Sequence, residues 1–165
     1  MLRSALVFFG FALASLSAGL AQAAVHVTPP DVNGTRTLQE QTGTAAIRDY
    51  LESWQTFKTA LEQNRVDVLD RDFVGTEKEK LTETIQEQRA AEIRTSYQDR
   101  SHDIQIVFYS PEGLSLELTD NVEYDVQVLV HDKSVATQKV RARYIVVMTP
   151  TETRWRVRVY QAVNE

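Results

Sequence analysis

Two polar side chains in the second half of the chain are of types that can transfer protons. His102 alternates with Ile104, and Asp120 alternates with Leu118 and Val122. Because neighbouring residues on a strand point to opposite faces, both side chains are expected on the apolar face of a sheet. Burial raises the pKa of a carboxyl group, and a general acid or base near neutral pH requires such a pKa. Asp120 and His102 are therefore the candidate acid and base.

A bend in the chain is the alternative explanation for these two residues. Asp120 lies in the segment "TDN", and Asp and Asn are common where a strand bends, which favours this alternative. Asp120 would then reach solvent, and His102 would lie at an open rim. The enzyme hypothesis instead requires both side chains to enter one cavity, within about 3 Å or one water of a common point.

Other catalytic signatures are absent from the sequence. It contains no phosphate-binding loop, zinc-ligand spacing, nucleophile elbow or glycine-rich fingerprint. The three histidines, His26, His102 and His131, have no ligand spacing to one another. We therefore expect neither a metal ion nor a cofactor.

An arginine occupies every second position at the start of "RWRVRVY", residues 154–160. In a strand, this spacing places Arg154, Arg156, Arg158 and Tyr160 on the outer face, opposite to Trp155. Such a row is either the solvated face of a strand or a surface that binds an anion or a partner. Acids on a neighbouring strand can pair with the arginines, so the solvated face explains most of the row.

The predicted register leaves one feature of this face unexplained. A turn centred near Ser134 places Asp125 opposite Arg143, but the last strand then sets Arg158 beside Arg143, a like-charge pair that destabilises an isolated sheet. An acidic surface of a second copy would relieve this repulsion, so a homodimer through the sheet is predicted. The predicted interface combines arginines with apolar side chains: Tyr109, Arg141, Arg143, Ile145, Val147, Arg156, Arg158 and Tyr160.

The elements that would position these residues follow from the hydrophobic period. From Thr44, apolar residues recur at steps of three and four, which predicts a long helix: Ile47, Tyr50, Leu51, Trp54, Phe57 and Leu61. A short second helix is expected to end near Gly75, and a capping-box pattern of Thr76 and Glu79 opens a third that runs to about Asp99. After Asp99 the period changes to 2, and four alternating segments with short connections predict an antiparallel meander. Helices followed by strands indicate the α+β class.

The first 23 residues have the layout of a secretory signal peptide. They contain Arg3, an apolar run to about Leu20, and small residues at Ala21 and Ala23. Cleavage after Ala23 predicts an exported protein, either periplasmic or secreted. The alternative is a retained membrane anchor, because the apolar run approaches the ~20 residues that span a bilayer. Residues 24–43 are rich in turn residues and are expected to form a linker or N-terminal arm, and residues 44–165 form one domain.

Charge and cysteine content narrow the function classes. The chain has 18 basic and 23 acidic residues, and removal of Arg3 leaves 17 against 23, a net charge of -6. Such a surface repels nucleic acid and anionic lipid, so we expect neither nucleic acid nor, after removal of the signal peptide, a membrane as partner. Cysteine is absent, so packing must stabilise the protein without disulfides.

The order of elements, together with "VDVLDRDFVG" and "RWRVRVY", resembles the nuclear transport factor 2-like superfamily over about residues 44–163. The resemblance implies three N-terminal helices packed on a curved four-stranded antiparallel meander, a cystatin-like cone with an apolar pocket. It also implies a sheet face that often forms dimers. Members of the superfamily include isomerases, dehydratases and polyketide cyclases, but many are binding or assembly modules, so the fold does not decide the function.

We predict a binding or assembly module without catalysis, which acts through the cone pocket, the outer sheet face or both. A small apolar ligand and a second copy of the chain are the expected partners. Core-facing aromatic residues would fill the core or line the pocket: Tyr50, Trp54, Tyr124, Tyr144 and Trp155. The alternative is a small-molecule isomerase or lyase that uses Asp120 and His102 as acid and base.

Overall fold

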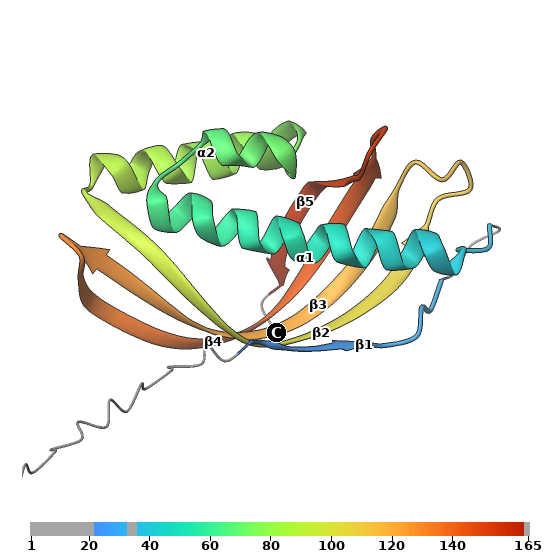
Figure 1. Cartoon of the computed structure of the whole chain (residues 1–165), viewed down its shortest axis with the longest axis horizontal. Coiled ribbons are helices and arrows are strands. Elements are labelled where there is room, and N and C mark those ends of the chain that lie inside the picture. Colours follow the sequence, from blue (N-terminus) through green and yellow to red (C-terminus); the bar gives the residue numbers. More distant parts are fainter. Residues whose placement is uncertain (1–21, 33–35, 164–165) are drawn as a thin grey trace, which may run out of the picture.

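The computed structural model describes residues 22–32 and 36–163 of the chain. Its elements follow in the order β1 (Ala24–Val27), α1 (Glu40–Gln63), the 3-10 helix η1 (Asp67–Arg71), α2 (Gly75–Ala90), β2 (Ile93–Tyr109), β3 (Leu116–Val130), β4 (Lys133–Pro150) and β5 (Trp155–Val163). Both α-helices lie on one side of the curved sheet (Figure 1). The α+β class is confirmed. The predicted signal peptide lies outside the described residues, except for Gln22 and Ala23.

The long helix α1 begins at Glu40, four residues before the predicted start. One stripe of its surface is buried against the sheet and includes Ala46, Tyr50, Trp54, Phe57 and Leu61. The helix ends where Asn64 adopts a left-handed conformation, with φ of 51°, which asparagine tolerates better than most residues. The second predicted helix is only the 3-10 turn η1. The expectation of three helices is therefore wrong by one in the described part of the chain.

The helix α2 is shorter than predicted. It starts at Gly75 with no side-chain cap, so the capping box of Thr76 and Glu79 does not form. It ends at Ala90, and Glu92 then turns the chain at a φ of 55° into β2. Segment 93–99, expected to be helical, is the start of β2.

The sheet has the strand order β1-β2-β3-β4-β5. The four long strands form the predicted antiparallel meander, whereas β1 runs parallel to β2 with Ala24 opposite Ser101. The segment expected to be a linker or arm therefore contributes an edge strand and the first turn of α1. The prediction of four strands is corrected to five in a mixed sheet.

Two β-bulges change which face the following residues occupy. In β2 the register shifts between Ile106 and Phe108, so Tyr109 lies opposite Leu116 on the core face. In β5 the register shifts at Arg158, so Tyr160 lies opposite the buried Val146. An extra residue in one strand reverses the alternation that follows it. The predicted outward positions of Tyr109 and Tyr160 are therefore wrong.

The β3–β4 hairpin turns earlier than predicted. His131 and Asp132 form a two-residue turn and both have positive φ, 47° and 63°, as tight hairpins require. The predicted turn near Ser134 is wrong, and Asn121 rather than Asp125 lies opposite Arg143.

The like-charge pair behind the dimer prediction does not occur in this register. Arg143 lies opposite Val163 on β5 and opposite Asn121 on β3. Arg158 occupies the bulge between the residues opposite Val147 and Met148. A second acidic surface is therefore not needed to separate Arg143 from Arg158.

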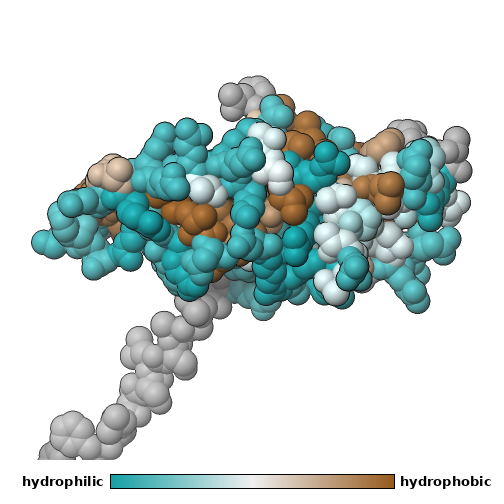
Figure 2. Space-filling view, turned by 90° about the horizontal axis from the view of Figure 1, so that it is seen from above, coloured by the Kyte–Doolittle hydropathy of each residue, from teal (hydrophilic) through white to brown (hydrophobic). Residues whose placement is uncertain are grey.

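The surface on the helix side is mostly hydrophilic, with hydrophobic side chains visible in hollows between polar ones (Figure 2). In the described part of the chain, no helix combines the length and the apolar character needed to cross a membrane.

Candidate functional site

A buried carboxylate lies at the centre of the interior between α1 and the sheet. Asp120 on β3 is fully buried, and its Oδ2 accepts a hydrogen bond from the Tyr50 hydroxyl of α1 at 2.7 Å. His102 Nδ1 lies 2.6 Å from the same oxygen. The strands bring the two residues together, because His102 pairs with Val122 and Asp120 with Ile104. They are therefore diagonal neighbours on one face of the β2–β3 pair.

These positions overturn the alternative in which "TDN" forms an exposed bend. Asp120 lies within β3 and is paired on both sides, with Ile104 and with Tyr144. His102 is also buried, with 2% of its surface exposed, and does not lie at an open rim. The structure thus brings the two candidate residues into direct contact, and it adds Tyr50, which the sequence analysis had treated only as core or pocket lining.

An aromatic cluster surrounds this contact. Trp54 packs against His102 with ring centroids 5.2 Å apart, and Tyr160 stacks on Tyr144 at 4.6 Å. The Tyr124 and Tyr144 hydroxyls are 3.1 Å apart. Of the five residues predicted to line the pocket, Trp155 lies apart from this cluster and contacts Tyr109.

Burial and the Asp120 carboxylate control the chemistry of the tyrosines. Burial raises the pKa of Tyr50 well above its ordinary value, and the charge of Asp120 and the hydrogen bond to it raise it further. Burial also raises the pKa of Tyr160 well above the ordinary value and that of Tyr97 to about 12. These hydroxyls therefore stay protonated near neutral pH and can act only as hydrogen-bond donors or acceptors.

Among the buried polar atoms without a hydrogen-bond partner in the described residues, three belong to Asp120 and the aromatic cluster around it. They are Asp120 Oδ1, Trp54 Nε1 and Tyr160 Oη, and all three are buried. Buried polar groups are usually paired, so these atoms can bind water or a polar group of another molecule.

An open groove of about 1050 Å³ runs between α1 and the β1–β2 edge of the sheet, and His102 lines it. Its apolar lining comes from Val25, Ile47 and Leu51. Its polar lining includes the ion pair of Lys58 and Asp99, whose Oδ1 is buried with no partner among the described residues. We call this the α1–β2 groove. Because Asp120 binds Nδ1 of His102, Nε2 is the ring nitrogen that a molecule in this groove could contact.

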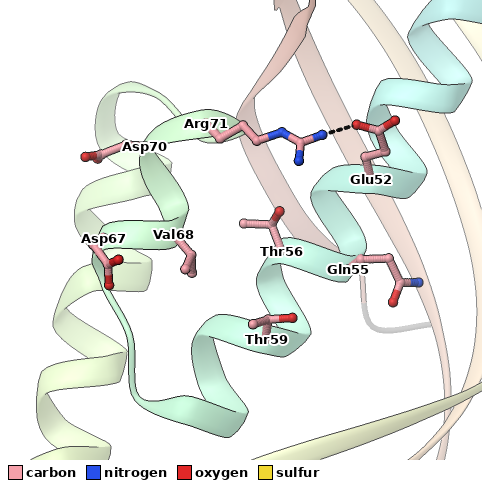
Figure 3. Close-up of a pocket in the computed structure, with 8 residues that line it drawn as sticks. All are labelled: Glu52, Gln55, Thr56, Thr59, Asp67, Val68, Asp70 and Arg71. Atoms are coloured by element: carbon pink, nitrogen blue, oxygen red, sulfur yellow. Dashed lines mark hydrogen bonds and ion pairs between the residues drawn. The ribbon is translucent and has the colours of Figure 1, made fainter.

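A second groove, of about 870 Å³, lies between α1 and η1 and is rich in acids (Figure 3). Its carboxylates are already paired within the chain. Glu52 binds Arg71 across the groove, Asp67 binds Arg65 at 2.5 Å, and Asp70 binds Lys78 at 2.5 Å. This groove therefore offers little charge to a cation. In residues 22–32 and 36–163, no three His, Cys, Asp or Glu side chains are grouped so that they could hold a metal ion.

The arginine row of β5 does not form one surface. Arg154 points to the helix side, where only 13% of its side chain is exposed and it contacts Asp49, Glu52 and Asp72. Arg158 is exposed in its bulge. The arginines of β4 remain on the outer face, and Arg141 pairs there with Glu123 at 2.8 Å. Ile145 and Val147 share this face and are half-buried.

Sequence reasoning missed several residues of this region. The Lys58–Asp99 ion pair joins α1 to a segment that was expected to be helical, so no pattern pointed to it. The Tyr50–Asp120 hydrogen bond joins residues 70 positions apart. Tyr50 could have been singled out as a tyrosine on the buried stripe of α1, because a buried tyrosine hydroxyl usually has a hydrogen-bond partner.

Comparison with known proteins identifies relatives of the fold alone. No protein-family model matches the sequence, and no curated protein sequence matches it. The intermembrane space region of chloroplast protein ARC6 is similar in structure, with a TM-score of 0.64, 12% identity, and coverage of 79% of this chain and 100% of that chain. A putative scytalone dehydratase from Novosphingobium aromaticivorans is similar with a TM-score of 0.53, 12% identity, and coverage of 76% and 89%. The second similarity agrees with a nuclear transport factor 2-like fold.

Proposed function

We propose that the protein is a binding module for a small molecule that lies in the α1–β2 groove. The observation that carries this proposal is the combination of apolar side chains in the groove lining with His102, a polar group held in place by the fully buried Asp120. Ligand sites commonly combine apolar walls with a few well-placed polar groups. The groove volume of about 1050 Å³ lies just above the range of about 300–1,000 Å³ for small-molecule sites.

The lining suggests the chemistry of the ligand. Val25, Ile47 and Leu51 fit an apolar body, and His102 Nε2 fits one polar group on it. Lys58 also lines the groove, but its positive charge is paired with Asp99. A neutral or weakly acidic apolar molecule is therefore a better match than a multiply charged one.

A thermal-shift screen of apolar alcohols, ketones and carboxylic acids tests this proposal. Compounds that stabilise the protein are then titrated by calorimetry into the Leu51→Trp variant, whose indole fills the groove. The matched control is Val135→Trp, at an exposed position on β4. We expect Kd to rise at least tenfold in Leu51→Trp and to stay unchanged in the control. Equal affinities in both variants, or no stabilising compound among these classes, would contradict the proposal.

Proton transfer is the second candidate function, an isomerase or lyase with His102 as the base and Asp120 as the group that orients it. The observation that favours it is the 2.6 Å contact of His102 Nδ1 with a buried carboxylate, since a base is commonly oriented by a third group in this way. NMR of a bound compound in D₂O tests it. Catalysis would be supported if the wild type exchanges a carbon-bound proton of the compound and the His102→Asn variant binds the compound but does not exchange the proton. Binding without proton exchange in the wild type would contradict catalysis and favour a binding module.

Export and self-association are separate proposals. The mass of the mature protein would show whether residues 1–23 are removed, and a retained Met1 would contradict export. A homodimer through the outer face now depends on Arg141, Arg143, Ile145 and Val147. Sedimentation at several concentrations tests it, and a wild type that stays monomeric at high micromolar concentration would refute it.

A further inference from the structure

The first half of β4 is an unpaired edge of the sheet. β5 pairs only with the segment from Arg143 to Pro150, so the preceding segment, Lys133–Ala142, has β3 on one side. No other strand of the described residues pairs with its second side. The β3–β4 hairpin projects beyond β5 (Figure 1), and residues 133–139 are exposed. Free N–H and C=O groups on such an edge are a template for a further strand. We call this segment the β4 edge.

The β4 edge is basic in a protein that is acidic overall. The net charge of the chain is -5, yet the β4 edge contains three basic residues, Lys133, Lys139 and Arg141, and no acidic one. Lys139, Arg141 and Arg143 alternate on the outer face. Arg141 pairs with Glu123, but 83% of its side chain is still exposed. An incoming strand would therefore place two of its side chains beside Lys139 and Arg141.

The opposite face of the β4 edge is mostly small or apolar, with one glutamine. It presents Ala136, Gln138, Val140 and Ala142, which alternate with the basic residues. A strand that fits both faces must alternate acidic and apolar side chains. β3 already shows this match on the other side of β4, since Glu123 and Asp125 alternate with Tyr124 and Val126 and lie opposite Arg141 and Lys139.

We propose that an extended acidic segment of a partner protein adds to the β4 edge as a further strand. Its backbone would satisfy the free N–H and C=O groups, and its acids would lie beside Lys139 and Arg141. A second copy fits less well, because two β4 edges would bring their basic side chains together. This surface is separate from the α1–β2 groove and does not depend on the small-molecule proposal.

A peptide that copies β3 is a direct probe. The capped peptide "NVEYDVQV", residues 121–128, is compared with a peptide in which lysine replaces both acids, and with one N-methylated at alternate residues. Binding is followed by fluorescence anisotropy and by hydrogen exchange of the purified protein. We expect the acidic peptide to bind and to slow exchange within residues 133–142, and both altered peptides to bind at least tenfold more weakly. Equal binding of the N-methylated peptide, or of an oligonucleotide of similar charge, would overturn strand addition.

Protein variants locate the site. The double variant Lys139→Glu with Arg141→Glu should weaken binding of the acidic peptide about tenfold or more, because attraction at two positions becomes repulsion. Arg158→Glu is the matched control, an exposed charge on β5 outside the edge, and should bind nearly as well as wild type. Equal losses in both would show a diffuse charge effect and overturn the proposal. Protection of residues 133–142 that rises with protein concentration alone would assign the edge to a second copy instead.

Discussion

Replacing Arg154 by methionine should destabilise the protein strongly, because Arg154 is the shared cation of three acids. Its Nη1 lies 3.2 Å from Asp72 Oδ1, and its Nη2 lies 2.6 Å from Glu52 Oε2 and 3.8 Å from Asp49 Oδ1. Asp72 is fully buried, and Asp49 is only 2% exposed. The network joins α1, the end of η1 and the start of β5. The Arg154→Met substitution keeps most of the side-chain length and removes only the charge and the donors.

The expected loss in the free energy of unfolding depends on which partners each acid keeps in the variant. Removing one partner of a buried ion pair costs about 3–5 kcal/mol, because the other charge stays buried. Asp49 keeps Arg48 Nη2 at 2.9 Å and the Trp155 N–H at 2.8 Å, and Asp72 keeps the Thr56 hydroxyl. We therefore expect the low end of this range, about 3 kcal/mol. For a domain of this size, that lowers Tm by roughly 10 °C.

Urea denaturation of the wild type and the variant at neutral pH measures this loss. Arg158→Met is the matched control and should stay within about ±0.5 kcal/mol, because Arg158 is exposed. Adding Asp72→Asn to Arg154→Met should recover part of the stability, since it removes the buried charge left behind. A loss below about 1 kcal/mol for Arg154→Met would mean that the network behaves like surface ion pairs. The absence of any recovery in the double variant would show that the unpaired charge of Asp72 is not the cause of the lost stability.

Two further substitutions test the interior and a buried acid. Tyr50→Phe removes a hydrogen bond to a carboxylate and should lower the free energy of unfolding by about 1.5–3 kcal/mol. Tyr124→Phe removes a hydrogen bond between neutral hydroxyls and should lower it by only about 1 kcal/mol. Urea denaturation compares the two variants, and a larger loss in Tyr124→Phe would contradict the stronger hydrogen bond expected between Tyr50 and Asp120. Burial raises the pKa of Glu77, so its stabilising contribution is present at low pH and is lost as the pH rises through the folded-state pKa. Glu77→Gln should therefore raise Tm at pH 7 relative to wild type and change it less near pH 4, and a variant destabilised equally at both values would show that burial is not the controlling factor.

Alternation along single strands was predicted well from the sequence. In β3 the even-numbered positions face the core, from Leu116 to Tyr124, because one buried face imposes a period of 2. The stripe of α1 was likewise evident from Tyr50 to Leu61. Both patterns depend only on local spacing along the chain, so the α+β class and the meander followed from them.

Features set by pairing between strands could not be predicted in this way. The bulges before Tyr109 and Tyr160 each insert one residue without a local composition signal, and each turns a tyrosine from the outer face to the core. The hairpin turn at His131 and Asp132 has no glycine, so its position was misjudged and the register with it. These errors account for the difference between the predicted arginine-rich interface and the surface found.

The burial of Asp120 shows how the helix and the sheet together decide what a polar residue does. Its parity indicated the core, whereas its neighbours in "TDN" indicated a bend, and local sequence alone could not separate the two. β4 settles the conflict by pairing Tyr144 with Asp120, which keeps the strand continuous. Because the strand is continuous, its alternation directs the Asp120 carboxylate into the interior, where Tyr50 and His102 stabilise it. His102 is in turn fixed at the wall of the α1–β2 groove, so the group proposed to bind a ligand is positioned by Asp120, which the ligand need not touch.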